Sequence, residues 1–169
     1  DSAPGRGASF QVLLPRTSET AVSEAAGTNE LPTGTESVLF VDDEDFLVQL
    51  GTQMLMSLGY TVVGMNDSVE ALRLFRQDPG RFDLVVTDQT MPHMTGYEFA
   101  QKIMALRPDI PVILCTGFSE TVSPEKAQAC GIKAFIMKPH TRKTIAEIIR
   151  KVLDTANNIK PRPGTAATQ

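Results

Sequence analysis

Four short apolar stretches of this chain are each followed directly by a residue whose side chain could do chemistry. Asp42 and Asp43 follow the first stretch, Asp88 the second, Thr116 the third and Lys138 the fourth. Short apolar runs are typical of buried parallel strands, and ligands of an open α/β sheet bind just beyond the carboxyl ends of its strands. We therefore expect three carboxylates, a hydroxyl and an ammonium to meet at one edge of a sheet.

The acidic residues indicate a divalent cation. Adjacent strands lie about 4.8 Å apart, so Asp43 and Asp88 should bring two carboxylates within a few ångströms, with Asp42 close behind. Carboxylates at that separation repel each other, and one is driven to take up a proton unless a cation lies between them. Oxygen ligands without nearby His or Cys favour Mg²⁺, which also binds phosphate oxygens. Taken singly, Asp42 and Asp43 could cap a helix and Asp88 could be a solvated loop acid; together they predict a magnesium site.

Lys138 and Thr116 indicate that the ligand is a phosphoryl group. An ammonium offsets the charge of phosphoryl oxygens and a hydroxyl can donate to them. Taken singly, one could be a surface lysine and the other a strand-end threonine chosen for β-propensity. A cis peptide before Pro139 would turn Lys138 back toward the strand ends.

The sequence contains no P-loop, no nucleophile-elbow motif and no dinucleotide-binding glycine motif after a strand. A carboxylate beside Mg²⁺ can attack phosphorus and form an acyl phosphate. The metal and Lys138 would stabilise the oxygens in transfer.

These residues need a sheet to position them, and the apolar pattern supplies one. Strands are expected at 37–41, 60–65, 83–87, 111–115 and 134–137. Amphipathic helices are expected at 47–58, 68–77, 95–106, 123–131 and 141–153. Alternating strands and helices predict an α/β fold, a doubly wound parallel sheet of five strands in the order 2-1-3-4-5 with five helices on its two faces.

The remaining segments differ in composition from this core. Residues 17–36 are rich in Thr, Ser, Glu, Ala and Gly and predict a flexible linker. Residues 37–154 form the predicted globular domain, and residues 155–169 a mobile C-terminal tail. A start at Asp1 rather than Met favours a piece of a longer protein.

Composition limits the classes of function. The 169 residues carry a net charge of −4, which gives no electrostatic case for binding nucleic acid. No apolar run approaches the ~18 residues needed to cross a bilayer, so we expect no membrane contact by this segment. Cys115 and Cys130 are interpreted as buried thiols in a reducing compartment, and we expect a cytoplasmic location.

The motifs together resemble the receiver domain of two-component response regulators, over Ser37 to about Asp154. The matching elements are Val41-Asp42-Asp43-Glu44, Thr87-Asp88-Gln89-Thr90-Met91-Pro92-His93-Met94-Thr95-Gly96, Cys115-Thr116-Gly117 and Phe135-Ile136-Met137-Lys138-Pro139. The resemblance implies a flavodoxin-like receiver fold and a phospho-accepting module that takes a phosphoryl group from phosphohistidine.

The same resemblance implies a role for each site residue. Asp88 is the implied phospho-acceptor and Lys138 the implied phosphate partner. Thr116 and Phe135 are the implied switch pair. The implied ligands of Mg²⁺ are Asp42, Asp43, Asp88 and the backbone carbonyl of Thr90.

Residues 1–16 carry a second resemblance, to the final glycine turn and strand of a histidine-kinase ATP-binding domain. An unrelated leader is the alternative. The first interpretation makes this segment the C-terminal receiver of a hybrid sensor histidine kinase, whose parent chain is a protein-histidine kinase. The implied partners are the kinase's phosphohistidine domain and a histidine phosphotransfer protein, and the receiver itself is not expected to be a turnover enzyme.

Three other functions compete with this interpretation. The first is a haloacid-dehalogenase-type phosphatase using Asp43-Glu44-Asp45, although the expected threonine and cap segment do not follow. The second is a degenerate receiver that only binds proteins. The third is a flavin-binding protein of the same topology, although no hydroxyl-rich phosphate loop follows the first strand.

Overall fold

The computed structural model describes Leu13, residues 31–117 and residues 130–159. The chain divides into two units, residues 1–30 and 31–169, and only the second is considered below. Leu13 is exposed and belongs to no helix or strand. The other residues of the strand predicted within 1–16 lie outside the described residues.

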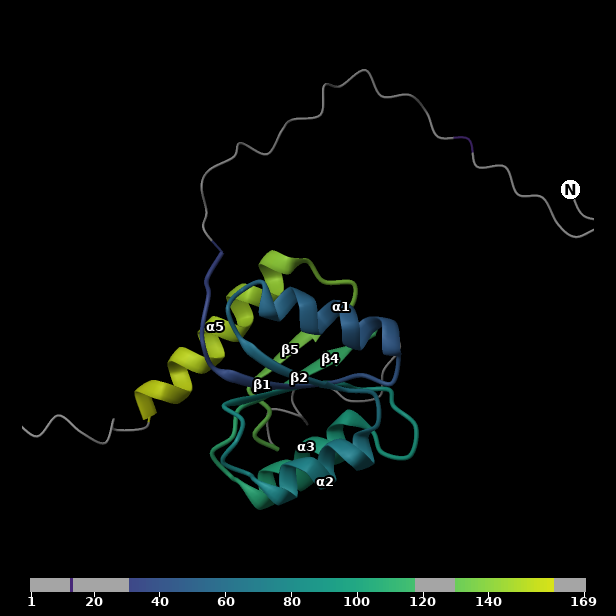
Figure 1. Cartoon of the computed structure of the whole chain (residues 1–169), viewed down its shortest axis with the longest axis vertical. Helices are drawn as coiled ribbons and strands as arrows, with labels where there is room; N and C mark the ends of the chain where they lie inside the picture. Colours follow the sequence, from purple (N-terminus) through teal and green to yellow (C-terminus); the bar gives the residue numbers. More distant parts are fainter. Residues whose placement is uncertain (1–12, 14–30, 118–129, 160–169) are drawn as a thin grey trace, which may run out of the picture. The chain divides into compact units, whose positions relative to one another are not determined.

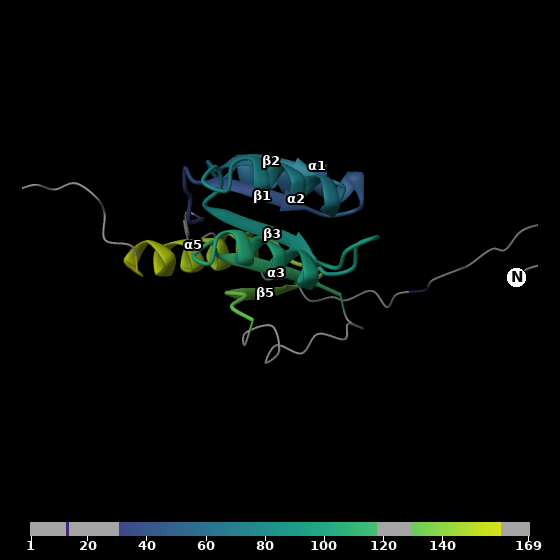
Figure 2. The same cartoon turned by 90° about the horizontal axis from the view of Figure 1, so that it is seen from below.

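Five parallel strands form one sheet in the order β2-β1-β3-β4-β5, as the sequence predicts. Figure 2 shows the succession from β2 through β1 and β3 to β5. The strands are β1 (Ser37–Val41), β2 (Thr61–Met65), β3 (Leu84–Asp88), β4 (Val112–Thr116) and β5 (Ala134–Met137). The last four residues of β1 are buried, and so are all five residues of β3 and all five of β4. This burial fits strands that are covered on both faces.

Helices cover both faces of the sheet, with α1 and α5 on one side and α2 and α3 on the other (Figure 1). They are α1 (Asp45–Met56), α2 (Ser68–Gln77), α3 (Gly96–Leu106) and α5 (Arg142–Ile159). The predicted fifth helix, 123–131, falls almost wholly on residues 118–129, which lie outside the described residues. Gly131 at its predicted end has a left-handed φ of 96°.

Side chains alternate between two apolar cores, one on each face of the sheet. Leu39, Val85 and Leu114 pack with α2 and α3, whereas Phe40, Val86 and Cys115 pack with α1 and α5. The sheet is thereby fixed between two layers, and the carboxyl ends of its strands have defined positions.

Two predicted boundaries differ from the structure. The last helix was expected to end at 153, but α5 continues to Ile159, so the first residues of the predicted tail are helical. Residues 31–36 were expected to belong to a flexible linker, but they pack on the domain. Leu31 contacts the core beneath α1 and α5, and the Gly34 amide donates to the Leu58 carbonyl at 3.1 Å. Composition did not show this, because the partners are far away in the sequence.

The thiols match the prediction in part. Cys115 is buried and Cys130 is half-buried, and neither forms a disulfide. Cys130 lies in a turn and is half-buried rather than buried as predicted. Within residues 31–117 and 130–159, no helix is long and apolar enough to cross a membrane.

Candidate functional site

Lys138 joins two of the predicted acidic residues at the carboxyl edge of the sheet. Its Nζ donates to Oδ2 of Asp42 at 2.7 Å and lies 2.5 Å from Oδ1 of Asp88. The two carboxylates are almost fully buried, whereas the lysine side chain is 28% exposed. Two carboxylates against one ammonium leave an excess of negative charge, which favours the binding of a further cation at this edge.

The strand register explains why these three residues meet. Val41 pairs with Thr87, so the next residues, Asp42 and Asp88, lie side by side at the ends of β1 and β3. The Lys138 amide donates to the Thr116 carbonyl at 2.8 Å, which fixes the end of β5 beside β4. The peptide between Lys138 and Pro139 is cis, as considered from the sequence.

The charges of the site are set by burial and by the lysine. Burial raises the pKa of the Asp88 carboxyl, against the opposing effects of Lys138 and of the Thr90 amide. Burial acts to lower the pKa of Lys138, but hydrogen bonds to Asp42 and Asp88 outweigh it and the pKa is raised. Lys138 is therefore a permanent cation at physiological pH.

Asp43 does not join the two buried carboxylates. It is exposed, and it lines a separate cavity of about 150 Å³ together with Asp67 and His93. Successive side chains of an extended segment point in opposite directions, so Asp42 turns inward and Asp43 outward. Among the described residues, no three side chains of His, Cys, Asp or Glu are grouped to hold a metal. The oxygen chemistry of Asp42 and Asp88 fits Mg²⁺, but the predicted convergence of three acids is not present.

The loop after Asp88 is held by backbone hydrogen bonds. The Thr90 amide donates to Oδ2 of Asp88 at 2.6 Å, which fixes the orientation of that carboxylate. The Gln89 amide donates to the Cys115 carbonyl at 2.8 Å, and the Gly96 amide donates to the Gln89 carbonyl at 3.0 Å. These contacts place the start of α3 directly against the end of β3.

Gly96 ends the matching motif that contains Asp88, but the sequence analysis gave it no role at the site. A Cβ at this position would lie 2.0 Å from the carbonyl oxygen of Asp88, so only glycine allows this approach. A further signal for such a role was its place at the first position of a helix, where glycine is a poor helix former. Thr95 supplies the cap, because its hydroxyl accepts from the Glu98 amide and the Glu98 carboxylate accepts from the Thr95 amide.

Thr116 and Phe135, the predicted switch pair, lie on adjacent strands of the same sheet face. Thr116 pairs with Met137 and Leu114 pairs with Phe135, so the two side chains share the face that α2 and α3 cover. Thr116 is buried and Phe135 is half-buried against that core. Asp88 pairs with Cys115, the neighbour of Thr116, and its side chain leaves β3 on the other face of the sheet.

A cavity of about 410 Å³ opens beside the acidic pair. Asp42, Asp88, Lys138 and His140 line one part of it, and apolar residues line the rest: Phe40, Leu47, Leu50, Gly51, Met54, Cys115 and Pro139. Burial, and then the charge of Lys138, lower the pKa of His140. The sequence analysis did not identify His140 as a site residue, because nothing in the sequence placed it beside α1.

Comparison with known proteins agrees with this arrangement. The sensor kinase CckA of Brucella abortus (strain 2308) is 31% identical over 163 residues, 91% of this chain and 17% of CckA. The two-component response regulator ORR24 of Oryza sativa subsp. indica is 29% identical over 131 residues, 78% of this chain and 21% of ORR24. The chain thus spans a small part of the length of these two relatives.

Solved structures are similar in fold. A response regulator receiver domain protein from Clostridium thermocellum has a TM-score of 0.71 at 26% identity, covering 74% of this chain and 99% of its own. The chemotaxis protein CheY4 of Vibrio cholerae has a TM-score of 0.61 at 30% identity, covering 70% of this chain and 99% of its own. The model of the response regulator receiver domain family matches residues 38–150. The chain therefore belongs to this family, and residues 38–150 are a receiver domain of two-component signal transduction.

Proposed function

We propose that Asp88 accepts a phosphoryl group from a phosphohistidine. The observation that carries this proposal is the position of Lys138, whose ammonium lies between Asp42 and Asp88 at the wall of an open cavity. A carboxylate oxygen of Asp88 attacks phosphorus, a new P–O bond forms and the P–N bond to the donor imidazole breaks. The imidazole leaves with the electron pair of that bond and takes up a proton from solvent.

Lys138 would stabilise the transferred group as a point cation. When Mg²⁺ is bound, it neutralises phosphoryl oxygens that the single ammonium does not reach. We assign its protein ligands to Asp42, Asp43, Asp88 and the Thr90 carbonyl. Asp43 does not lie with the two buried carboxylates, so this assignment requires its exposed side chain to turn toward the cation when the metal binds.

Thr116 and Phe135 are proposed to report the phosphorylated state. Their common face and adjacent strands would let a movement of the threonine hydroxyl toward the phosphoryl group change the space beside the phenylalanine ring. This part of the proposal is supported by position alone.

The phosphohistidine donor is proposed to be a helical domain that binds along α1. Leu50 is 45% exposed and lines the cavity that ends at Asp88, and Leu47 and Met54 extend the same apolar wall. A histidine held on a partner helix would enter at the polar end of this cavity while apolar residues cover the rest. The two free cysteines support a reducing, cytoplasmic setting.

The parent is proposed to be a hybrid sensor histidine kinase. The similarity to CckA covers 91% of the chain, which is more than the receiver region 38–150, so it includes flanking residues. This supports an origin in a kinase rather than in a free-standing regulator. A downstream histidine phosphotransfer protein is the second proposed partner.

Intact mass after incubation with acetyl phosphate and Mg²⁺ tests the phospho-acceptor. We expect the full chain to gain one phosphoryl group, Asp88→Asn to gain none, and Asp109→Asn to behave as the wild type. Asp109 is a matched control because it precedes β4 and lies at the opposite edge of the sheet. Unchanged phosphorylation of Asp88→Asn would refute the assignment. A wild-type chain that gains nothing would favour a degenerate receiver, and steady turnover of a generic phosphate ester would favour a phosphatase.

A further inference from the structure

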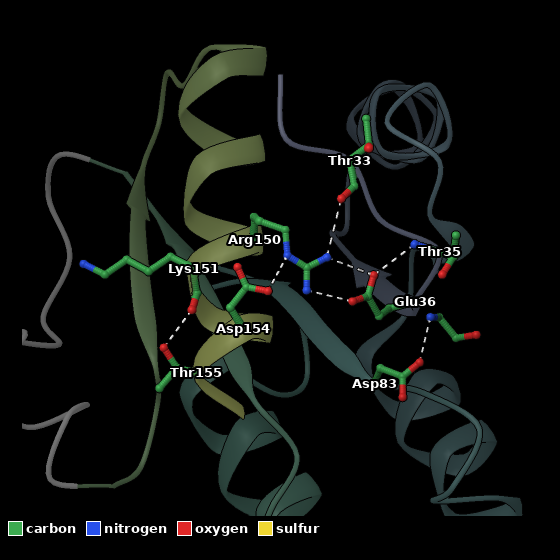
Figure 3. Close-up of polar contacts among 9 residues, drawn as sticks. Thr33, Thr35, Glu36, Asp83, Arg150, Lys151, Asp154 and Thr155 are labelled. Atoms are coloured by element: carbon green, nitrogen blue, oxygen red, sulfur yellow. Dashed lines mark hydrogen bonds and ion pairs between the residues drawn. The ribbon is translucent and has the colours of Figure 1, made fainter. Parts of the chain in front are cut away.

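The residues just before β1 form hydrogen bonds and an ion pair with α5, the last helix of the domain. Arg150 on α5 binds Glu36 with both ends of its guanidinium, from Nη1 to Oε2 at 3.2 Å and from Nη2 to Oε1 at 2.8 Å. Figure 3 shows this arginine between Glu36, the Thr33 carbonyl and Asp154. Both side chains of the pair are about one-fifth exposed, so the interaction is partly shielded from solvent.

Backbone contacts hold the same residues independently of the arginine. The Gly34 amide donates to the Leu58 carbonyl at 3.1 Å, and the Thr61 amide donates to the Glu36 carbonyl at 3.0 Å. Gly34 also requires close packing, because a Cβ there would lie 2.3 Å from the Tyr60 ring and from the Glu36 carboxylate. The segment before β1 therefore packs closely on the domain and is not held by an isolated pair of surface side chains.

We propose that residues 31–36 form a strap, closed by Arg150, that can open without unfolding the receiver and that sets where the chain enters the domain. A bidentate arginine–carboxylate pair is among the stronger surface interactions. After its loss the strap keeps the two backbone hydrogen bonds, the packing of Gly34 on Tyr60 and the Leu31 contact. The strap has few buried apolar contacts compared with β1, which is typical of a segment that opens locally.

The strap lies at the amino edge of the sheet, because it leads into β1, whereas Asp88 lies at the carboxyl edge. Opening it would add six residues, up to about 20 Å, to the tether upstream of Ser37. A five-residue strand is about 17 Å long, so a fully extended strap could span the sheet from its amino edge to its carboxyl edge. This consequence rests on the proposed function, in which a histidine domain upstream in the same chain must reach Asp88.

Hydrogen exchange measured by NMR on the full 169-residue chain tests the strap. We expect Arg150→Gln to speed exchange of the Gly34 amide about tenfold or more, while amides inside β1, such as that of Leu39, keep their protection. Lys151→Gln is the matched control, because it removes the same charge from the next residue of α5, which is exposed. Glu36→Gln should resemble Arg150→Gln, and the double variant should exchange no faster than either single variant.

Three outcomes would overturn the proposal. They are an unchanged Gly34 rate in Arg150→Gln, an equal acceleration in Lys151→Gln, and an equal loss of protection at Leu39. The rate of cleavage after Glu36 by a glutamyl endopeptidase gives a second measurement, with cleavage after Glu30 as the reference. This rate should rise in Arg150→Gln and stay at the wild-type value in Lys151→Gln. The phosphoryl gain at Asp88 is measured separately by intact mass. A chain that is not phosphorylated could still show the opening of the strap, and a phosphorylated chain could still lack it, so the two failures can be told apart.

Discussion

The ammonium of Lys138 lies 2.5 Å from the carboxylate of Asp88, although fifty residues of chain separate them and the lysine contacts Asp42 as well. Removing the lysine would leave two buried carboxylates without the cation that lies between them, although each still accepts a backbone N–H. We expect Lys138→Met to lower the free energy of unfolding by about 2–4 kcal/mol, somewhat less than the roughly 3–5 kcal/mol lost when a fully buried ion pair is broken, because the lysine side chain is 28% exposed. Urea unfolding measures this loss.

A second substitution separates charge from packing in that experiment. Lys138→Met combined with Asp88→Asn should recover part of the lost stability, because only one buried carboxylate then remains. A double variant as unstable as the sum of the two single variants would show that the lysine acts through packing of its stem rather than through its charge.

The close approach of Gly96 to Asp88 gives a steric prediction. Gly96→Ala places a methyl group against a backbone oxygen that cannot move without displacing β3, so we expect a loss of about 1–3 kcal/mol. Gly80→Ala is the control, since the nearest atom to its Cβ would be a side-chain oxygen of Asp78 at 3.4 Å. Equal stability of the two variants in urea would contradict the role given to Gly96.

The α1 surface can be tested with two exposed apolar residues of the same helix. Leu50 lines the cavity beside Asp88, whereas Met56, 57% exposed, does not. We expect Leu50→Ala to reduce the rate of phosphoryl transfer from a phosphorylated histidine phosphotransfer protein by about tenfold, and Met56→Ala to leave it unchanged. Acetyl phosphate needs no docking surface, so the rate at which it phosphorylates the chain should be the same in both variants.

The two cysteines should differ in reactivity. Burial raises the pKa of the Cys115 thiol to about 12 from 9.0, and the thiolate is the reactive form. We expect iodoacetamide to label Cys130 and to spare Cys115 in the folded chain at pH 8, with peptide mass spectrometry as the measurement. Because the folded state disfavours the Cys115 thiolate, stability should fall as the pH rises above 9.0, and Cys115→Ala should weaken that fall.

The stability of the strap should depend on pH in the opposite direction, because the strap is weakened as the pH falls. Burial alone would raise the pKa of Glu36, but the hydrogen bond from Arg150 outweighs it and the pKa is lowered from 4.5. The pair therefore stabilises the strap fully above 4.5 and is lost as the pH falls through the lowered value. Protection of the Gly34 amide, corrected for the intrinsic rate, should decline over that range in the wild type and stay flat in Glu36→Gln.

Much of the fold follows from local pattern. The short apolar runs predict each strand to within about a residue at most ends, because a strand buried on both faces leaves no room for polar residues. The strand order also follows, since Asp42 and Asp88 gain a common function only if the first and third strands are neighbours. Helix ends were less well predicted: α5 continues past Leu153 through Asp154 to Ile159, where apolar periodicity has already weakened.

The sequence by itself determined which residue types stand at the carboxyl edge of the sheet, because each follows a buried strand directly. Only the tertiary structure decided how they are arranged. Lys138 turned out to join Asp42 and Asp88 while Asp43 points outward, since adjacent residues alternate and burial selects one of them. The strap was likewise decided by tertiary contacts: Glu36 looks like part of a polar linker until α5 brings Arg150 to it from more than a hundred residues away.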